Sequence, residues 1–332
     1  MTGMGRAEQP SGLAGGGVIR MSRAEQPSLP SGGGVIGVCR AEQPPGQAGD
    51  LIEVRRAGPR TTVQDLGRPG WAHLGVPRSG ALDPAALALA NRLVGNPADA
   101  AGLELTLGGG ELRLTRAGTV AVTGADVDVR VDDRPGDVGR PLAVPAGAVL
   151  RIGSPRHGLR NWLAVDGGIA VAPVLGSRST DTLSGLGPPP VGDGDRLPLG
   201  PPAGPPAPVD FTVGRPVPEE LWLTLRPGPR ADWFTPEALE LLRGTAYTVS
   251  PVSDRVGARL VGAALARAVA GELPSEGVVL GAVQVPADGQ PLIFLADHPT
   301  TGGYPVIGVV DDVTGLAQAR PGTTVRFHGP QR

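Results

Sequence analysis

From residue 51 onward, short runs of alternating apolar and polar residues are separated by glycine, proline and aspartate. Such runs are typical of β-strands with one buried face, and the intervening residues favour turns. In the first half we expect strands at Leu51–Val54, Leu103–Leu107, Glu111–Thr115, Thr119–Thr123, Val127–Val131, Ala148–Ile152 and Trp162–Val165. In the second half we expect strands at Leu221–Leu225, Tyr247–Val249, Val278–Val283, Leu292–Leu295, Val306–Val310 and Thr324–Phe327. The pattern therefore predicts a mainly β protein, a barrel or a sandwich.

Two segments interrupt this alternation and favour helices. The dipeptide Asp83–Pro84 is a typical helix start, with a capping side chain followed by proline, and good helix formers continue over Ala85–Val94 until Gly95. A second helix is predicted at Pro236–Arg243, with Thr235 as its cap. The chain should therefore carry a few short helices among many strands.

The distribution of repeats and prolines suggests how the chain is divided. In residues 1–50 the sequence Arg-Ala-Glu-Gln-Pro recurs, starting at Arg6, Arg23 and Arg40. This leader has too little apolar surface to offset the entropy of ordering, so we expect disorder. The stretch 201–210 is too rich in proline for an interior strand or helix. We expect a linker there, between a first β-barrel subdomain at 51–200 and a second at 211–332.

Composition narrows the classes of partner. The chain of 332 residues has a net charge of −2 and 3% aromatic residues, so we expect no nucleic-acid partner. No apolar run reaches the ~20 residues that cross a bilayer, so we expect no membrane span. The single cysteine, Cys39, lies in the leader and excludes an intrachain disulfide. A cytoplasmic location is therefore expected.

The chain contains no lysine, because all 30 basic residues are arginine. It therefore cannot carry biotin on a carrier lysine, form a Schiff base or supply the lysine of a phosphate-binding loop. Biotin could take part only on another chain, and no covalent cofactor is expected. Any anion site must use arginine and backbone N–H groups.

Two polar clusters in the first half could carry chemistry. The loop 61–83 suits recognition of an anion or an amide, although its members could equally cap turns and pair on the surface. The segment 175–182 places hydroxyls around one guanidinium and could hold a carboxylate or phosphate, or be a solvated turn. The candidate substrate-binding residues are Gln64, Asp65, Arg68, Arg78 and Ser79 in the first cluster, and Ser177, Arg178, Ser179 and Thr180 in the second.

The second half supplies the candidates for proton transfer. A strand at Leu292–Ala296 leads to Asp297 and His298, and His298 is the best general acid or base, with Asp297 or Glu276 as its carboxylate partner. Alternatively, His298 and Tyr304 are turn residues. The other histidines are scattered and predict no metal site. Further substrate-binding candidates are Asp254, Arg255, Thr300, Thr301, Gly302, Gly303 and Tyr304.

Several segments, in order, carry a resemblance to a known family. They are TTVQDLGRPG from Thr61, LGVPRSGALD from Leu74, ANRLVGN from Ala90, VLGSRST from Val174, SDRVGARL from Ser253, SEG from Ser275, GAVQV from Gly281 and TTGGYP from Thr300. From about Leu51 to Phe327 the chain resembles the 5-oxoprolinase C-subunit family, also labelled KipA-like, allophanate hydrolase subunit two and urea-amidolyase-related biotin-dependent carboxyltransferase. The leader is absent from the family pattern, and the position of Val306 holds a basic residue in some relatives.

This resemblance implies tandem cyclophilin-like β-barrels and partner subunits. With a B subunit, which is KipI-like, and an A subunit, the family opens 5-oxo-L-proline to L-glutamate with ATP, which a partner could bind. On this hypothesis Arg78, Arg178 and Arg255 converge from both halves on a small anionic amide substrate, while Asp297 and His298 handle protons. Two alternatives remain: a biotin-dependent carboxyltransferase component acting on urea or a related amide, and a KipA-like regulator that binds a KipI-type partner.

Overall fold

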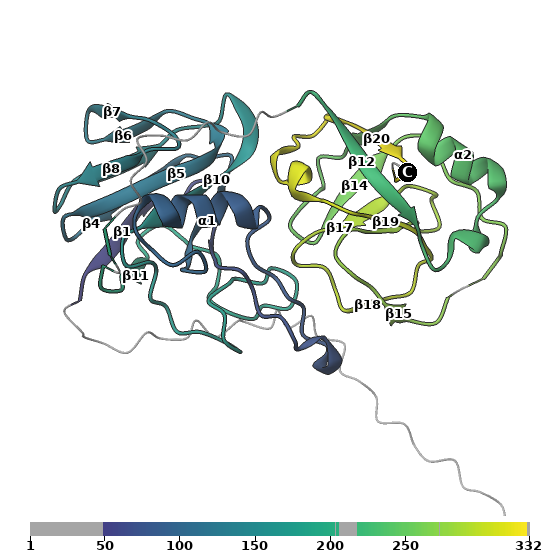
Figure 1. The fold of residues 1–332 in the computed structure, drawn as a ribbon, viewed down its shortest axis with the longest axis horizontal. Helices are drawn as coiled ribbons and strands as arrows, with labels where there is room; N and C mark the ends of the chain where they lie inside the picture. Colours follow the sequence, from purple (N-terminus) through teal and green to yellow (C-terminus); the bar gives the residue numbers. More distant parts are fainter. Residues whose placement is uncertain (1–48, 203, 206–217, 272, 331–332) are drawn as a thin grey trace, which may run out of the picture. The chain divides into compact units, whose positions relative to one another are not determined.

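The computed structural model describes residues 49–202, 204–205, 218–271 and 273–330, all within one compact unit. Nearly all of the predicted leader and most of the predicted linker therefore lie outside the described residues. The described chain is mainly β with two short α-helices, which confirms the predicted fold class (Figure 1). The proposed subdomain limits stay a prediction, although the strands of the first half end before 200 and those of the second begin after 218.

The strands of the first half form two antiparallel sheets. They are β1 (Leu51–Arg56), β2 (Arg60–Gln64), β3 (Gly102–Thr106), β4 (Gly110–Leu114), β5 (Gly118–Asp126), β6 (Val129–Val131), β7 (Arg134–Gly136), β8 (Pro141–Val144), β9 (Val149–Ile152), β10 (His157–Val165) and β11 (Arg196–Pro198). One sheet has the order β11-β1-β4-β9-β6-β7 and the other the order β2-β3-β10-β5-β8.

An apolar core lies between these two sheets. Leu103 and Leu105 of β3 and Leu112 of β4 are all buried in one cluster, as alternation along the strands predicts. The other face of the five-stranded sheet contacts helix α1 (Pro84–Leu93). As expected, Asp83 caps this helix, because its Oδ1 accepts a hydrogen bond from the backbone N–H of Ala86 at 2.9 Å.

The second half closes into a seven-stranded barrel of order β12-β19-β16-β17-β14-β13-β20. Its strands are β12 (Glu220–Pro227), β13 (Tyr247–Val249), β14 (Gly257–Val261), β16 (Ala282–Gln284), β17 (Leu292–Phe294), β19 (Val306–Val310) and β20 (Thr324–His328). The closing pair, β12 with β20, is parallel. Helix α2 (Pro236–Gly244), a small pair β15 (Glu276–Gly277) with β18 (Thr301–Gly302), and the 3-10 helices η1 (Ala72–Leu74), η2 (Ala231–Trp233) and η3 (Thr314–Gln318) complete the fold.

The two halves share an apolar cluster and hydrogen bonds between a side chain and the backbone. Leu82 and Trp162 of the first half belong to the same buried cluster as Phe327 of the barrel. In addition, Gln318 Oε1 accepts hydrogen bonds from the backbone N–H groups of Leu159 and Arg160 at 2.7 and 3.0 Å. The halves therefore bury part of their surface against each other.

The strand predictions differ from the structure mainly where glycine or threonine blurs the alternation. In place of the predicted strand Val278–Val283 the structure has the shorter and later β16. Gly281, directly before it, has a φ of +79°, and a Cβ there would lie 2.4 Å from the Val310 carbonyl oxygen. The strands that were not predicted are β2, β7, β8, β11, β14, β15 and β18. β2 occupies the start of the polar loop 61–83, so part of that loop is a strand.

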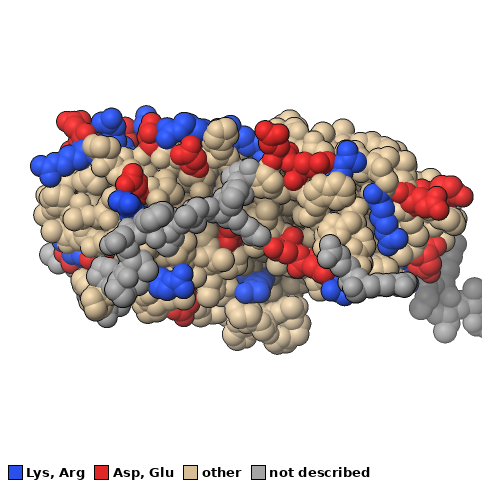
Figure 2. All heavy atoms as spheres, turned by 45° about the horizontal axis from the view of Figure 1, so that its top comes forward, with Lys and Arg blue, Asp and Glu red and all other residues tan. Residues whose placement is uncertain are grey.

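Acidic and basic side chains lie close together on the face shown in Figure 2. Exposed or half-exposed ion pairs of the described chain include Arg113 with Glu53 at 2.8 Å and Arg56 with Glu111 at 3.0 Å. Such pairs contribute little to stability. Within the described residues, no helix is long and apolar enough to span a membrane.

Two leucines that are two residues apart in the sequence test the core assignment. Leu105 is fully buried, whereas Leu107 is 43% exposed. Leu105→Ala should lower the free energy of unfolding by about 2–5 kcal/mol, because it removes buried methyl groups and leaves a cavity. Leu107→Ala should change it by about 0.5 kcal/mol or less. Urea unfolding followed by tryptophan fluorescence measures both, and equal losses would contradict the described core.

Candidate functional site

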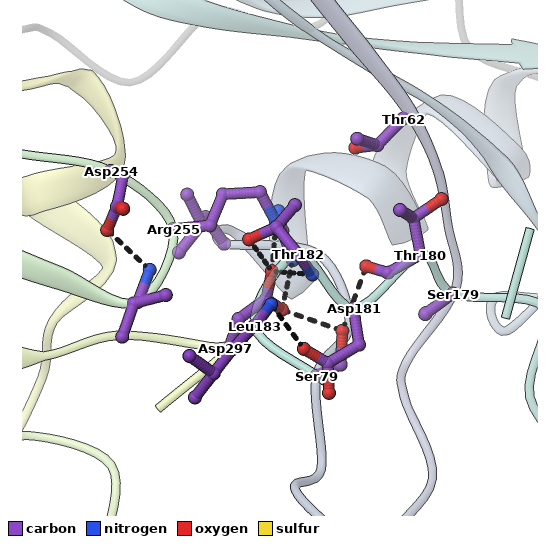
Figure 3. Close-up of polar contacts among 12 residues, drawn as sticks. Thr62, Ser79, Ser179, Thr180, Asp181, Thr182, Leu183, Asp254, Arg255 and Asp297 are labelled. Atoms are coloured by element: carbon purple, nitrogen blue, oxygen red, sulfur yellow. Dashed lines mark hydrogen bonds and ion pairs between the residues drawn. The ribbon is translucent and has the colours of Figure 1, made fainter. Parts of the chain in front are cut away.

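A buried carboxylate that follows β17 holds three separate segments of the chain together (Figure 3). Asp297 is fully buried, and its Oδ1 accepts a hydrogen bond from Ser79 Oγ at 2.7 Å. Its Oδ2 accepts from the backbone N–H and the Oγ1 hydroxyl of Thr182 at 3.0 and 2.7 Å. Arg255 adds a bidentate pair, with Nε 2.9 Å from Oδ2 and Nη2 3.0 Å from Oδ1. Asp297 thus joins the barrel to two loops of the first half.

Arg255 bridges this carboxylate to a second one on β3. Its Nη1 donates to Glu104 Oε1 at 2.5 Å, and its Nη2 donates to the Gly80 carbonyl oxygen at 2.6 Å. Glu104 Oε2 accepts from Trp162 Nε1 at 3.0 Å and from the backbone N–H of Leu82 at 2.9 Å. Arg255 and Glu104 are each 1% exposed, so this is a desolvated ion pair with its hydrogen bonds satisfied. We call Glu104, Arg255, Asp297, Ser79 and Thr182 the buried ion network.

The charge states in this network follow from burial and pairing. Burial alone raises the pKa of Asp297, but the Arg255 charge and the hydrogen bonds from Arg255, Thr182 and Ser79 outweigh it and hold the pKa below its ordinary value. Burial lowers the pKa of Arg255, and the two carboxylates more than reverse this effect. For Arg160, where Glu104 at 3.7 Å compensates less, burial lowers the pKa to about 10. These contacts favour a positioning role for Asp297 over the proton transfer predicted from the sequence.

A second buried carboxylate organises the neighbouring loop. Asp65 Oδ1 accepts from the hydroxyls of Ser177 and Ser179 at 2.6 and 2.5 Å and from the Gly67 N–H at 2.8 Å. Its Oδ2 accepts from the backbone N–H of Arg178 at 2.6 Å. The sequence predicted hydroxyls around a guanidinium, whereas in the structure they donate to a carboxylate. The side chain of Arg178 points to another partner, and its Nε donates to the Val171 carbonyl oxygen at 2.8 Å.

Three more of the predicted binding residues are buried beneath this loop. Arg68 is 1% exposed and donates to the carbonyl oxygen of Ser179. Burial lowers its pKa despite the nearby charges of Asp181 and Asp65. Gln64 Nε2 donates to the Thr180 carbonyl oxygen at 3.0 Å, and both residues are buried. Arg68, Gln64 and Thr180 therefore support the loops from the interior.

The backbone around Ser79 is held in an unusual conformation. Ser79 has a φ of +54°, in the left-handed region that disfavours residues with a Cβ. Opposite it, a Cβ on Gly67 would lie 2.6 Å from the carbonyl oxygens of both Arg78 and Ser79. The Arg68 N–H donates to the Arg78 carbonyl oxygen at 2.8 Å across this contact. The close approach of these two backbones explains the glycine in the sequence.

Beside this loop lies a cavity of about 170 Å³, which receives residues from both halves. Arg78, which is exposed, and Ser79 line it together with His298. The remaining lining residues are Leu66, Ala81, Leu82, Pro84, Leu280, Ala296, Val310, Asp311, Asp312, Val313 and Thr314. The predicted convergence of Arg78 and His298 on one pocket is therefore present in the structure, whereas Arg178 and the buried Arg255 are not among the lining residues.

His298 has the properties of a general base. Its Nδ1 lies 2.6 Å from the Pro299 carbonyl oxygen, which can only accept, so Nδ1 carries the hydrogen and Nε2 is the acceptor in the neutral ring. Burial lowers the pKa of His298, more than the Pro299 carbonyl and the charges of Asp297 and Asp181 raise it. The imidazole is therefore neutral near pH 7, with one nitrogen free to accept a proton.

The remaining predicted residues of the second half lie apart from the cavity lining. Glu276 on β15 forms an ion pair with Arg230, and the Arg230 hydrogen bond lowers its pKa despite some burial. The residues Thr300, Thr301, Gly302, Gly303 and Tyr304 form or flank β18, which pairs with β15. Asp254 is an exposed turn residue, because its Oδ1 accepts from the N–H groups of Val256 and Gly257 at 2.8 and 3.1 Å. Their predicted roles stay predictions.

Sequence reasoning missed Glu104 and Thr182. Glu104 stands between two leucines of a predicted strand, where a charged residue normally faces solvent, yet it is buried. No local pattern signals this burial, because the arginine that pairs with Glu104, Arg255, stands 151 residues later in the chain. Thr182 follows a recognised polar segment directly. In the described part of the chain, no group of three His, Cys, Asp or Glu side chains could hold a metal ion.

Comparisons with known proteins show the family of this chain. Residues 74–329 match the family described as carboxyltransferase domain, subdomain A and B. The chain is 40% identical to the C subunit of 5-oxoprolinase from Escherichia coli (strain K12) over 289 residues, which covers 83% of this chain and 90% of that protein. It is 33% identical to urea amidolyase of Lachancea kluyveri over 308 residues, covering 83% of this chain but 17% of that protein.

Solved structures show the same fold. The crystal structure of TTHA0988 superposes with a TM-score of 0.77 at 37% identity, covering 86% of this chain and 57% of that chain. The K. lactis urea amidolyase superposes with a TM-score of 0.78 at 29% identity, covering 85% of this chain and 19% of that chain. This chain therefore spans little more than half of the first of these proteins and about a fifth of the second.

The lowered pKa of His298 has a measurable consequence for stability. Because burial disfavours the imidazolium, the unfolded chain binds this proton more readily than the folded chain. The resulting stabilisation is present above the ordinary value of ~6.5 and is lost as the pH falls from there toward the folded pKa. The free energy of unfolding should therefore fall less between pH 7 and pH 5 in His298→Gln than in the unchanged protein. Equal pH dependence, measured by urea unfolding, would contradict the assignment.

Proposed function

Since this chain belongs to the carboxyltransferase domain family, subdomains A and B, we propose that it is the C subunit of a 5-oxoprolinase. In this proposal it works with the KipI-like B subunit of that enzyme, together with the A subunit, in opening 5-oxo-L-proline to L-glutamate, coupled to ATP hydrolysis. The observation that carries the proposal is the 40% identity to the corresponding C subunit of Escherichia coli, which extends over 90% of that protein. A hetero-oligomer in the cytoplasm follows from the same proposal.

The cavity is chemically suited to such a substrate. Its guanidinium, on Arg78, can bind a carboxylate by charge-assisted hydrogen bonds. His298 Nε2 can accept a proton from water or from the substrate, and the apolar residues Leu66, Leu82 and Leu280 can contact a small ring. A volume of about 170 Å³ favours a small molecule over a large one.

ATP does not fit the residues around this cavity. The cavity is smaller than the ~300–1,000 Å³ typical of sites for larger ligands. A wider groove of about 740 Å³ lies beside α1, but no arginine is among its described lining residues, so it offers a triphosphate no cation to pair with. The chain also lacks lysine. We therefore assign ATP binding to one of the partner subunits. The product of ATP-dependent activation would then reach this chain from that partner or at the interface with it.

A carboxyltransferase that acts on urea or a related amide is the second candidate. It is favoured by the family match at 74–329 and by the 33% identity to a urea amidolyase. In that case biotin would arrive on another chain, since no lysine is present to carry it. Arg78 and His298 would then act on a carboxyl group and an amide in the same cavity.

Reconstitution separates these possibilities and tests the role of Arg78. The chain, co-purified with its candidate A and B partners, should release glutamate from 5-oxoproline only when ATP is present. Arg78→Ala should lower kcat/KM by about tenfold or more, because the substrate carboxylate loses its cation. Arg92→Ala is the matched control, because Arg92 is exposed on α1 and outside the described cavity lining, and should leave the rate unchanged.

Two results would count against this assignment. If the assembled complex leaves 5-oxoproline intact but carboxylates urea when a biotin-carrier chain is added, the second candidate replaces the first. If Arg78→Ala and Arg92→Ala have the same effect, the cavity is not the substrate site. Glutamate can be quantified by a coupled dehydrogenase assay and ATP hydrolysis by phosphate release.

A further inference from the structure

The segment Ser79–Leu82, which contributes Ser79, Ala81 and Leu82 to one wall of the cavity, is held by a hydrogen bond at every residue. Ser79 Oγ donates to Asp297 Oδ1, and the Gly80 carbonyl oxygen accepts from Arg255 Nη2. The Ala81 N–H donates to the Asp65 carbonyl oxygen, and the Leu82 N–H donates to Glu104 Oε2. Three of these bonds end on the buried ion network. Because Arg78 directly precedes this wall, the position of its guanidinium depends on the same bonds.

Glu104 reaches this wall by two routes. Its Oε2 accepts the Leu82 N–H directly at 2.9 Å. Its Oε1 accepts from Arg255, whose Nη2 in turn donates to the Gly80 carbonyl oxygen at 2.6 Å. The Trp162 Nε1–H, at 3.0 Å from Oε2, fixes the orientation of the carboxylate from the other side. One side chain on β3 therefore holds two positions of the cavity wall.

We propose that Glu104 is a positioning residue for the cavity: it holds the wall 79–82, and through it Arg78, in the arrangement that binds the substrate. Glu104 is 1% exposed and is not among the cavity-lining residues, so it acts through other groups and not by touching the substrate. The kinetic consequence rests on the proposed function, whereas the structural consequence does not.

The negative charge of Glu104 matters, and not only its shape. Two buried guanidinium groups, Arg255 and Arg160, face two buried carboxylates, Glu104 and Asp297. Replacing Glu104 by glutamine leaves two cations with one carboxylate in a desolvated place, which weakens the hold on Arg255. Glutamine also has one side-chain oxygen where Glu104 has two, so the Arg255 guanidinium and the Leu82 N–H can no longer each donate to a separate oxygen.

Hydrogen exchange of the chain alone tests the structural part. In Glu104→Gln, the backbone amides of Arg78–Leu82 should exchange at least ~10-fold faster, because their anchor is weakened, with little change in β4 and β9. Glu111→Gln is the matched control, since Glu111 lies on β4 in a surface ion pair with Arg56. Unchanged exchange at Arg78–Leu82, or an equal increase over the whole chain, would overturn the proposal.

A double-mutant cycle in the assembled enzyme tests the kinetic part. Glu104→Gln should raise the KM for 5-oxoproline by ~10-fold or more, with a smaller change in kcat. In an Arg78→Ala background the same change should add little, because its effect passes through Arg78. Effects that multiply independently would overturn the positioning role, since a general loss of folded protein affects both backgrounds alike.

A conservative variant keeps the proposal testable if glutamine prevents folding. Glu104→Asp retains the charge but has a shorter side chain, so its contact with Arg255 should be kept better than its hydrogen bond from the Leu82 N–H. Its exchange rates and KM values should lie between those of the unchanged protein and those of Glu104→Gln. An aspartate variant identical to the unchanged protein in both would contradict the two-route arrangement. If the unchanged assembly does not open 5-oxoproline, the proposed function fails, and the exchange experiment still decides whether Glu104 fixes the wall.

Discussion

The structure depends on the burial of one guanidinium. Arg255 cannot give up its charge inside a protein, so its removal from water requires carboxylates and carbonyls on every side. Those partners come from both halves of the chain: Glu104 and Gly80 from the first, and Asp297 from the barrel itself. These contacts therefore hold the sheets and the barrel in one arrangement, which also fixes the positions of the loops between them.

This constraint separates supporting residues from accessible ones. Asp297, Arg255, Asp65 and Arg68 are all nearly or fully buried and direct their polar atoms to other parts of the chain. Arg78 and His298 remain beside the cavity with groups available to a small guest. A polar cluster in a sequence thus contains two kinds of residue, and burial distinguishes them. The kinship to the 5-oxoprolinase C subunits and to urea amidolyases is consistent with one scaffold that serves related amide chemistry.

Local signals in the sequence were sufficient for much of the fold. Alternation located most strands, and the capping residues Asp83 and Thr235 located both helices, because these features depend on neighbours in the chain. The juxtaposition of Arg78 and His298 came from resemblance and polarity together. Glu104 could not be found, because its burial depends on a cation far along the chain, and the φ of Ser79 depends on a backbone packed against it. Ion pairs and backbone contacts between residues far apart in the chain leave no local pattern from which a single sequence could predict them.

The parallel pairing of β12 with β20 has a consequence for how the chain is made. Glu220 pairs with Thr324, so β12 finds this neighbour only after the chain has been made as far as Thr324. The two sheets of the first half need no later residue for their ladders. Glu104 therefore meets Trp162 and Arg160 within the first half of the chain, and pairs with Arg255 only after 151 further residues have been added. The second half therefore supplies both the strand that closes the barrel and a second arginine for the Glu104 carboxylate.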